Sequence, residues 1–255
     1  MIILKSAREI ALMRAGGQIL AQAMGRLRDL VKPGVSTLEI DREVEALILA
    51  RGARPAFKGY RGFPATVCTS LNDEVVHGIP SAHRRVKEGD IVSLDLGCIV
   101  DGYYADCAFT LAIGEVPPRV QELLDVTRES LDLAIGQCRP GKRLGDVSHA
   151  VQAHVERHGF SVVRTFVGHG IGRALHEDPQ VPNFGEPGRG PLLKPGVVLA
   201  IEPMVTAGSA EVRILEDRWT AVTEDGSLAA HFEHTVAVTE DEPEVLTRLD
   251  GGSAA

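Results

Sequence analysis

Two capping boxes near the start of the chain predict two amphipathic helices. A serine is followed three residues later by a glutamate at residues 6–9 and again at residues 36–39; in this motif each side chain bonds the backbone of the other residue. The first helix should run to about Leu30, before the helix-breaking Lys-Pro-Gly at residues 32–34. The second helix, whose apolar positions share one face, should end at Gly52.

The rest of the chain alternates between irregular, strand-like and helical patterns. The mixed composition from Ala53 to Pro80 predicts a long irregular stretch. Two apolar runs meet at Asp101-Gly102 and predict a β-hairpin, because Asp-Gly is a preferred two-residue turn. The expected elements are strands at 90–99 and 103–113, a helix at 117–137, and a further helix that begins after the Arg-Pro-Gly break at 139–141 and runs to residue 159.

Matched residues recur 107 positions apart across two helices and a strand. They are Lys-Pro-Gly 32–34 with Arg-Pro-Gly 139–141, Val44 with Val151, Ile48 with Val155, Gly52 with Gly159, Lys87 with Lys194, and Asp95 with Glu202. We interpret this as an internal duplication, the alternative being coincidence among common turn residues. The prediction is an α+β fold in which pseudo-two-fold helix–helix–strand units form a curved antiparallel sheet covered by helices. One catalytic domain should span residues 1–250, with halves of about 1–114 and 115–250, and residues 251–255 should form a flexible tail.

Composition narrows the range of functions. The chain has 255 residues, 44% of them hydrophobic, and a net charge of −8, which disfavours nucleic acid as a substrate. Charged residues interrupt the apolar N-terminus, and no apolar run reaches 18 residues, so we expect neither a signal peptide nor a membrane span. The four cysteines form no Cys-x-x-Cys pair and fit a reducing, cytoplasmic environment.

Two aspartates interrupt the apolar strands of the predicted hairpin. If Asp101-Gly102 is the turn, Gly97 lies opposite Asp106, and Asp95 lies diagonal to Asp106 on the same face. Gly97 would leave open space beside these two carboxylates. Two buried carboxylates repel each other unless they are protonated or bridged by cations, so the hairpin indicates a cation site.

The second half repeats this arrangement with glutamates. Glu202 ends one apolar strand and Glu233 lies in another, so the duplication should bring four carboxylates together. Lys and Arg are absent from these strands near the acids, which leaves divalent metal ions as the expected counter-charge, and four carboxylates suit two ions. For each acid alone, the alternative is a strand edge that faces water.

Several histidines could complete such a site. His169 lies between two glycines, His176 follows in the same glycine-rich segment, and His77 lies in a similar loop. Histidine is a common neutral ligand beside carboxylates and a common acid or base near neutral pH; the alternative for each is a hydrogen-bonded structural role. His154 and His158, one turn apart on a predicted helix, lack the His-Glu-x-x-His order of a zinc protease and are expected to be structural.

Six segments together carry a resemblance to a known family: "GYRGFPATVCTSLNDEVVHGIP", "VSLDLG", "GYYADCAFT", "VGHGIGRALHEDPQVPNF", "LLKPGVVLAIEPM" and "DRWTAVTEDGSLAAHFEHTV". They resemble the methionine aminopeptidases, specifically the short bacterial type I form. The resemblance covers nearly the whole chain and implies the duplicated pita-bread fold of these metallopeptidases. It implies two divalent ions, Co, Mn, Fe or Zn, on five ligands: Asp95, Asp106, His169, Glu202 and Glu233.

The same resemblance implies roles for the neighbouring residues. Glu202 would shuttle a proton, His176 would stabilise the developing oxyanion, and His77 would contact the scissile amide nitrogen. The pocket for the methionine side chain would be lined by Tyr60, Phe63, Cys68, His77, His176 and Trp219, together with Phe166 or its neighbours.

The implied activity is removal of the initiator methionine from nascent proteins and peptides when the second residue is small. The expected setting is a cytoplasmic monomer, with transient ribosome contact as a further expectation. Two alternatives stay open: an X-Pro aminopeptidase or prolidase of the same fold, and a metal-free binding homologue.

Overall fold

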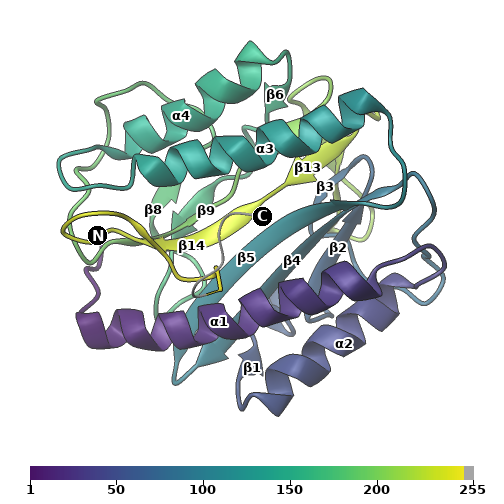
Figure 1. The fold of residues 1–255 in the computed structure, drawn as a ribbon, viewed down its shortest axis with the longest axis horizontal. Coiled ribbons are helices and arrows are strands. Elements are labelled where there is room, and N and C mark those ends of the chain that lie inside the picture. Colours follow the sequence, from purple (N-terminus) through teal and green to yellow (C-terminus); the bar gives the residue numbers. More distant parts are fainter. Residues whose placement is uncertain (250–255) are drawn as a thin grey trace.

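The structure, a computed structural model, describes residues 1–249. The predicted tail at residues 251–255 lies outside the described residues. Four helices lie on one face of a central sheet (Figure 1). Their bounds are α1 Ala7–Leu30, α2 Thr37–Ala50, α3 Pro118–Gly136 and α4 Leu144–Arg157, close to the predicted segments.

Both predicted capping boxes form. Ser6 N–H donates to Glu9 Oε2 at 2.8 Å, and Ser36 N–H donates to Glu39 Oε2 at 2.8 Å. The serine hydroxyls accept in return from the glutamate backbones. These reciprocal bonds satisfy helix N-terminal donors that would otherwise lack a partner, and so they fix where each helix begins.

The expectation of irregular structure from Ala53 to Pro80 is wrong. This segment contains β1 Arg54–Pro55, the 3₁₀ turn Tyr60–Gly62, β2 Val67–Leu71 and β3 Glu74–Val76. Strand β2 pairs antiparallel with β4, and its residues are buried with no alternation between apolar and polar positions. A strand buried on both faces shows no period-two pattern, so its sequence did not indicate it.

The large sheet of the described residues is antiparallel and has nine strands, in the order β1-β4-β5-β14-β9-β7-β8, with β2 also paired to β4 and β15 to β14. Two smaller three-stranded sheets flank it. The remaining strands are β4 Ile91–Val100, β5 Tyr103–Ala112, β6 Ser161–Val162, β7 Gly168–Gly170, β8 Glu177–Val181, β9 Val198–Ile201, β10 Met204–Thr206, β11 Val212–Ile214, β12 Ala221–Thr223, β13 Ala229–His231, β14 Glu233–Ala237 and β15 Glu244–Val245.

The 107-residue repeat is visible in the backbone. Helices α2 and α4 begin and end 107 residues apart, and so do strands β1 and β6. The isolated bridge Ser36↔Arg85 recurs as Arg143↔Leu192 at the same separation. The two halves join where β5 pairs with β14, at Ala108↔Glu233.

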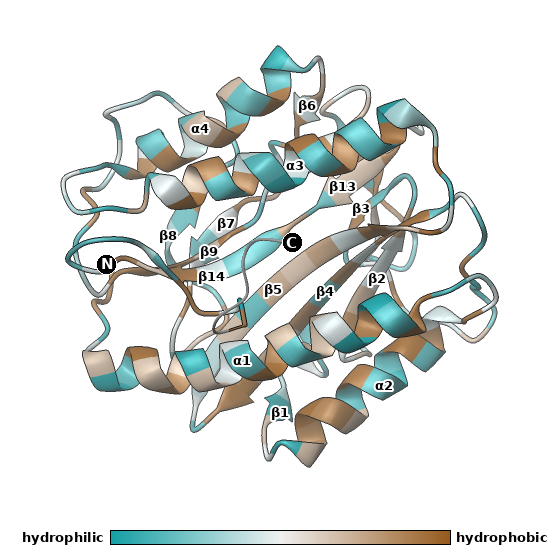
Figure 2. Ribbon diagram, in the orientation of Figure 1, coloured by the Kyte–Doolittle hydropathy of each residue, from teal (hydrophilic) through white to brown (hydrophobic). Residues whose placement is uncertain are grey.

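The core lies between the helices and the sheet. Apolar and polar residues alternate along the helices, while β4 and β5 are largely apolar (Figure 2). The largest fully buried side chains come from both layers, for example Leu20 and Leu27 from α1 and Leu94 and Leu96 from β4. Among residues 1–249, no helix has both the length and the apolar character that crossing a membrane requires.

Candidate metal centre and substrate pocket

The sheet surface away from the helices carries the carboxylates. Asp95 is on β4 and Asp106 on β5, and the hairpin has the predicted register, with Gly97 opposite Asp106. The turn residues Asp101 and Gly102 both have positive φ, 47° and 81°, as this hairpin turn requires. The predicted pair of aspartates is therefore present, but the expectation that Gly97 leaves open space is wrong, since a Cβ there would lie 2.7 Å from the Phe57 ring.

The two glutamates join them, but not through the symmetry that the sequence suggested. Glu202, which follows β9, is 107 residues from Asp95 and is its counterpart. In the second half, however, Met204 pairs with His231 where the first half pairs Gly97 with Asp106. His231 is thus the counterpart of Asp106. Glu233 is the counterpart of Ala108, with which it pairs at the junction of the halves.

His169 completes the cluster from β7. Its Nε2 lies 3.5 Å from Glu202 Oε1 and 4.0 Å from Asp106 Oδ2. Its Nδ1 lies 2.9 Å from the carbonyl oxygen of Gly170. Because that contact requires a proton on Nδ1, it leaves the Nε2 lone pair directed at the carboxylates, the arrangement typical of a metal-ligating histidine.

The glycines on either side of His169 are required by close packing of the backbone. A Cβ at Gly168 would lie 2.4 Å from the carbonyl oxygen of Ala200, and one at Gly170 would lie 2.1 Å from that of Asp178. The glycines therefore let the neighbouring backbone approach β7 closely. They place His169 by allowing the strands to pack rather than by clearing space around an ion.

The donor set fits divalent cations. Ligand atoms of Asp106, His169 and Glu233 all lie within 4.8 Å of one another. The buried oxygens Asp95 Oδ1, Asp106 Oδ1 and Glu233 Oε1 have no hydrogen-bond partner. Hard oxygen donors with one imidazole nitrogen suit Mn, Fe, Co or Zn, and a bound cation would relieve these unpaired atoms.

The pKa shifts of the clustered carboxylates also indicate a cation site. Burial raises the pKa of Asp95 to about 7, while hydrogen bonds from Asp106 and Cys68 partly oppose the shift. Burial and the neighbouring carboxylates raise the pKa values of Asp106 and Glu233 well above their usual range. Burial, followed by the charge of Asp95, does the same for Glu202. Without a cation, the cluster disfavours its own ionised state.

Two histidines flank the cluster without joining it. His176 Nδ1 lies 2.8 Å from Tyr60 Oη, and its ring lies 4.3 Å from that of His169, centroid to centroid. His77 has a left-handed backbone, with φ of 62°, which is uncommon outside glycine. Burial lowers the pKa of His77 to about 4, so its imidazole is neutral at pH 7.

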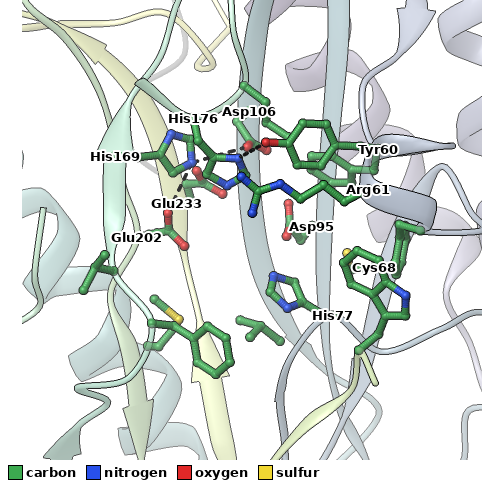
Figure 3. A pocket seen from close by; sticks show the side chains of 18 residues that line it. Tyr60, Arg61, Cys68, His77, Asp95, Asp106, His169, His176, Glu202 and Glu233 are labelled. Carbon is green, nitrogen blue, oxygen red and sulfur yellow. Dashed lines mark hydrogen bonds and ion pairs between the residues drawn. The ribbon is translucent and has the colours of Figure 1, made fainter. Parts of the chain in front are cut away.

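All predicted pocket residues line one cavity of about 300 Å³ with the cluster at its base (Figure 3). Phe63 and Trp219 meet edge to face at 5.1 Å, and His77 lies 5.5 Å from Phe166 and 6.2 Å from Trp219, centroid to centroid. The set is Tyr60, Phe63, Cys68, His77, Phe166, His176 and Trp219.

Sequence reasoning missed several neighbours: Arg61, Val76, Leu175 and Met204, which line the cavity, and His231 beside it. His231 is buried, with its Nε2 unpaired and 3.8 Å from Glu202 Oε2. The 107-residue repeat makes Met204 the counterpart of Gly97, and the residue paired with Met204, the counterpart of Asp106, is His231. His154 and His158 lie elsewhere, where His154 Nε2 contacts Glu129 Oε2 at 3.1 Å.

Comparison with known proteins identifies the family. The model of metallopeptidase family M24 matches residues 11–240. Methionine aminopeptidase 1 of Bacillus subtilis is 51% identical over 98% of this chain and 100% of its own length. The chain belongs to the methionine aminopeptidases of family M24. Membership of this metallopeptidase family implies use of divalent metal, in agreement with the carboxylate cluster.

Further relatives and solved structures support the same family and fold. Methionine aminopeptidase of Clostridium acetobutylicum is 52% identical over 97% of this chain and 99% of its own length. The crystal structure of methionine aminopeptidase from Thermotoga maritima superimposes with a TM-score of 0.96 at 48% identity, covering 98% of this chain and 100% of that one. A prolidase from Pyrococcus horikoshii, at 23% identity and a TM-score of 0.79 over 98% of this chain and 65% of that one, shares the fold. The predicted pita-bread fold and family are confirmed.

Proposed function

We propose that this M24 metallopeptidase removes the N-terminal methionine from nascent chains and peptides whose second residue is small. The observation that carries the proposal is one cavity of about 300 Å³ that joins a buried carboxylate–histidine cluster to an aromatic, sulfur-containing pocket. The similarity to the methionine aminopeptidases of Bacillus subtilis and Clostridium acetobutylicum supports the same substrate.

We propose that five residues hold two divalent ions, namely Asp95, Asp106, His169, Glu202 and Glu233. Their unpaired buried oxygens and the Nε2 lone pair of His169 support this assignment. Ions held there would supply Lewis acidity, which polarises a carbonyl and activates water at neutral pH. Mn, Fe, Co and Zn are all compatible with these donors.

The chain's own groups would orient the substrate and move protons. With ions held by these residues, the free α-amine of a substrate would bind there as a neutral amine, which directs the N-terminus to the base of the cavity. Glu202 would take a proton from the attacking water and pass it to the leaving amine. A residue in the middle of a chain has no free α-amine to bind at this position, so cleavage is confined to the first residue.

The two flanking histidines would act as neutral hydrogen-bond donors. Burial, and then the charge of Arg61, lower the pKa of His176, which favours its neutral form. If Tyr60 Oη donates to His176 Nδ1, the proton of the imidazole is on Nε2, where it can stabilise the developing oxyanion. His77, neutral for the reason given above, would contact the scissile amide nitrogen.

The pocket would accept the methionine side chain. Phe63, Cys68 and Trp219 surround a space suited to an unbranched thioether, because sulfur and aromatic rings pack favourably. A substrate with a β-branched or charged first residue would leave this space poorly filled or bury a charge.

The cellular setting is part of the proposal. All four cysteines are free and buried, which supports a reducing, cytoplasmic environment. We propose that the protein acts there as a monomeric single domain on nascent chains, with transient ribosome contact.

Peptide cleavage tests the activity. The protein loaded with Mn(II) should release methionine from Met-Ala-Ser and leave Ala-Pro-Ala intact, and a chelator or the Asp106→Asn variant should stop the release. Cleavage of Ala-Pro-Ala in preference to Met-Ala-Ser would show an X-Pro enzyme instead. Binding of neither metal nor peptide would favour a metal-free homologue.

A further inference from the structure

Arg61 occupies a fixed position at the mouth of the cavity. It lies in the 3₁₀ turn Tyr60–Gly62 with a left-handed backbone, φ 50° and ψ 22°, between two glycines of positive φ. Backbone bonds close this turn: Gly59 N–H donates to Phe63 O at 2.8 Å, and Phe63 N–H donates to Tyr60 O at 2.9 Å. The turn therefore holds the start of the Arg61 side chain in one direction, toward the cavity that it lines.

The Arg61 guanidinium has no acidic partner among residues 1–249. Its Cζ lies 5.4 Å from the centre of the Tyr60 ring, a cation–π distance. Figure 3 shows it extending across the cavity toward His176. Arg84, by contrast, forms an ion pair with Glu74. An exposed cation that faces a substrate channel and lacks a carboxylate from its own chain is available to a carboxylate of the substrate.

The position of Arg61 indicates which part of the substrate it meets. With methionine in the pocket and its α-amine at the carboxylate cluster, the rest of the peptide must leave past His176 toward solvent. Arg61 and His176 are both exposed residues of the cavity lining, so this exit passes them. An extended chain advances about 3.3–3.6 Å per residue, so the third residue lies about 7 Å past the first and within reach of a long arginine side chain. The second residue, restricted to small side chains, offers no carboxylate that extends so far.

We propose that Arg61 is a specificity-determining residue that binds the side-chain carboxylate of Asp or Glu at the third position of the substrate. This inference rests on the proposed function and adds a preference within it. Arginine suits the role because its planar guanidinium pairs with a carboxylate through two parallel hydrogen bonds. Since the pair is near solvent, its effect should be modest, about three- to tenfold in kcat/KM, and should weaken at high ionic strength.

The test compares isosteric peptides that differ only in charge. Met-Ala-Asp-Leu and Met-Ala-Asn-Leu, both amidated at the C-terminus so that the Asp side chain is the one carboxylate, are cleaved by the Mn(II)-loaded wild type and variants. The wild type should favour the Asp peptide about three- to tenfold. Arg61→Gln should reduce the Asp/Asn ratio to about one, and Arg61→Glu should favour Met-Ala-Lys-Leu.

Arg218→Gln is the matched control. Arg218 also has a left-handed backbone, φ 67°, and lies next to Trp219, but it does not line the cavity. It should keep the wild-type Asp/Asn ratio. Methionine release with equal rates for both peptides, or an Asp preference that survives Arg61→Gln, overturns the role of Arg61 alone. Failure of the wild type to release methionine from the Asn peptide overturns the proposed function and this inference with it.

Discussion

Replacing Asp95 by Asn should stabilise the metal-free protein, although it removes a proposed metal ligand. Asp95 Oδ1 is buried without a partner, and burial raises the pKa of this carboxyl to about 7. Because the folded pKa exceeds the unfolded value of 3.8, the proton stabilises the folded state below pH 4, and this contribution is lost as the pH rises through about 7.

The size of the effect follows from that difference. Each pKa unit corresponds to about 1.4 kcal/mol, so ionised Asp95 costs the metal-free fold about 4 kcal/mol above pH 7. A buried amide without full hydrogen bonding costs about 1–3 kcal/mol. The net gain for Asp95→Asn at pH 8 should therefore be about 1–3 kcal/mol, or several degrees in Tm at about 2–4 °C per kcal/mol.

Thermal and urea unfolding in chelator, at pH 5 and pH 8, measure this gain. It should be larger at pH 8. Asp101→Asn is the control, since it makes the same chemical change at the exposed, left-handed turn of the same hairpin, where Asn is tolerated. The control should stay within about 0.5 kcal/mol of wild type.

Added Mn(II) should make the wild type more stable than the Asp95→Asn variant. The wild type should gain more stability from metal than Asp95→Asn does, because the ligand that destabilises the metal-free fold contributes to metal affinity. An Asp95→Asn protein that is less stable than wild type in chelator at pH 8, or that gains equally from Mn(II), refutes the reasoning.

Three further predictions concern catalysis and packing. His77→Ala and His176→Ala should fold, retain metal and lose most turnover; loss of bound metal in either would make that histidine a ligand. Gly17→Ala should prevent stable folding, because its Cβ would lie 2.0 Å from a backbone oxygen, whereas Gly25→Ala in the same helix meets open space and should add about 0.5–1 kcal/mol. Lys5→Met should cost about 3 kcal/mol in urea unfolding, because Glu177 Oε2, 2.6 Å from Lys5 Nζ, would lose its cationic partner in a largely buried site and the carboxylate would keep only its backbone hydrogen bonds. Glu177 directly follows His176, so turnover should also slow; unchanged turnover would separate this pair from catalysis.

Local signals in the sequence predicted much of the fold. The Asp101-Gly102 turn fixed the register of its hairpin, because a two-residue loop leaves one pairing, and this placed Asp106 opposite Gly97. The duplication was evident because α2 and α4 share their spacing without an insertion. These features depend on residues close in sequence or at a constant separation.

Features that depend on distant packing were not predictable. Strand β7 is a Gly-His-Gly segment with little strand propensity, and it forms because close neighbours on both sides fit against its glycines. The equivalence of Glu233 with Ala108 was hidden because the second hairpin is interrupted at Phe232, between β13 and β14. All four carboxylates nevertheless converge, since Glu233 lies at the junction of the halves.

Anomalous diffraction from crystals grown with Mn(II) tests the central claim most directly. The account predicts Mn density in the cavity, within bonding distance of the side chains of Asp95, Asp106, His169, Glu202 and Glu233. Density that is absent from the cavity while Asp95 and Glu202 point away from each other would contradict it.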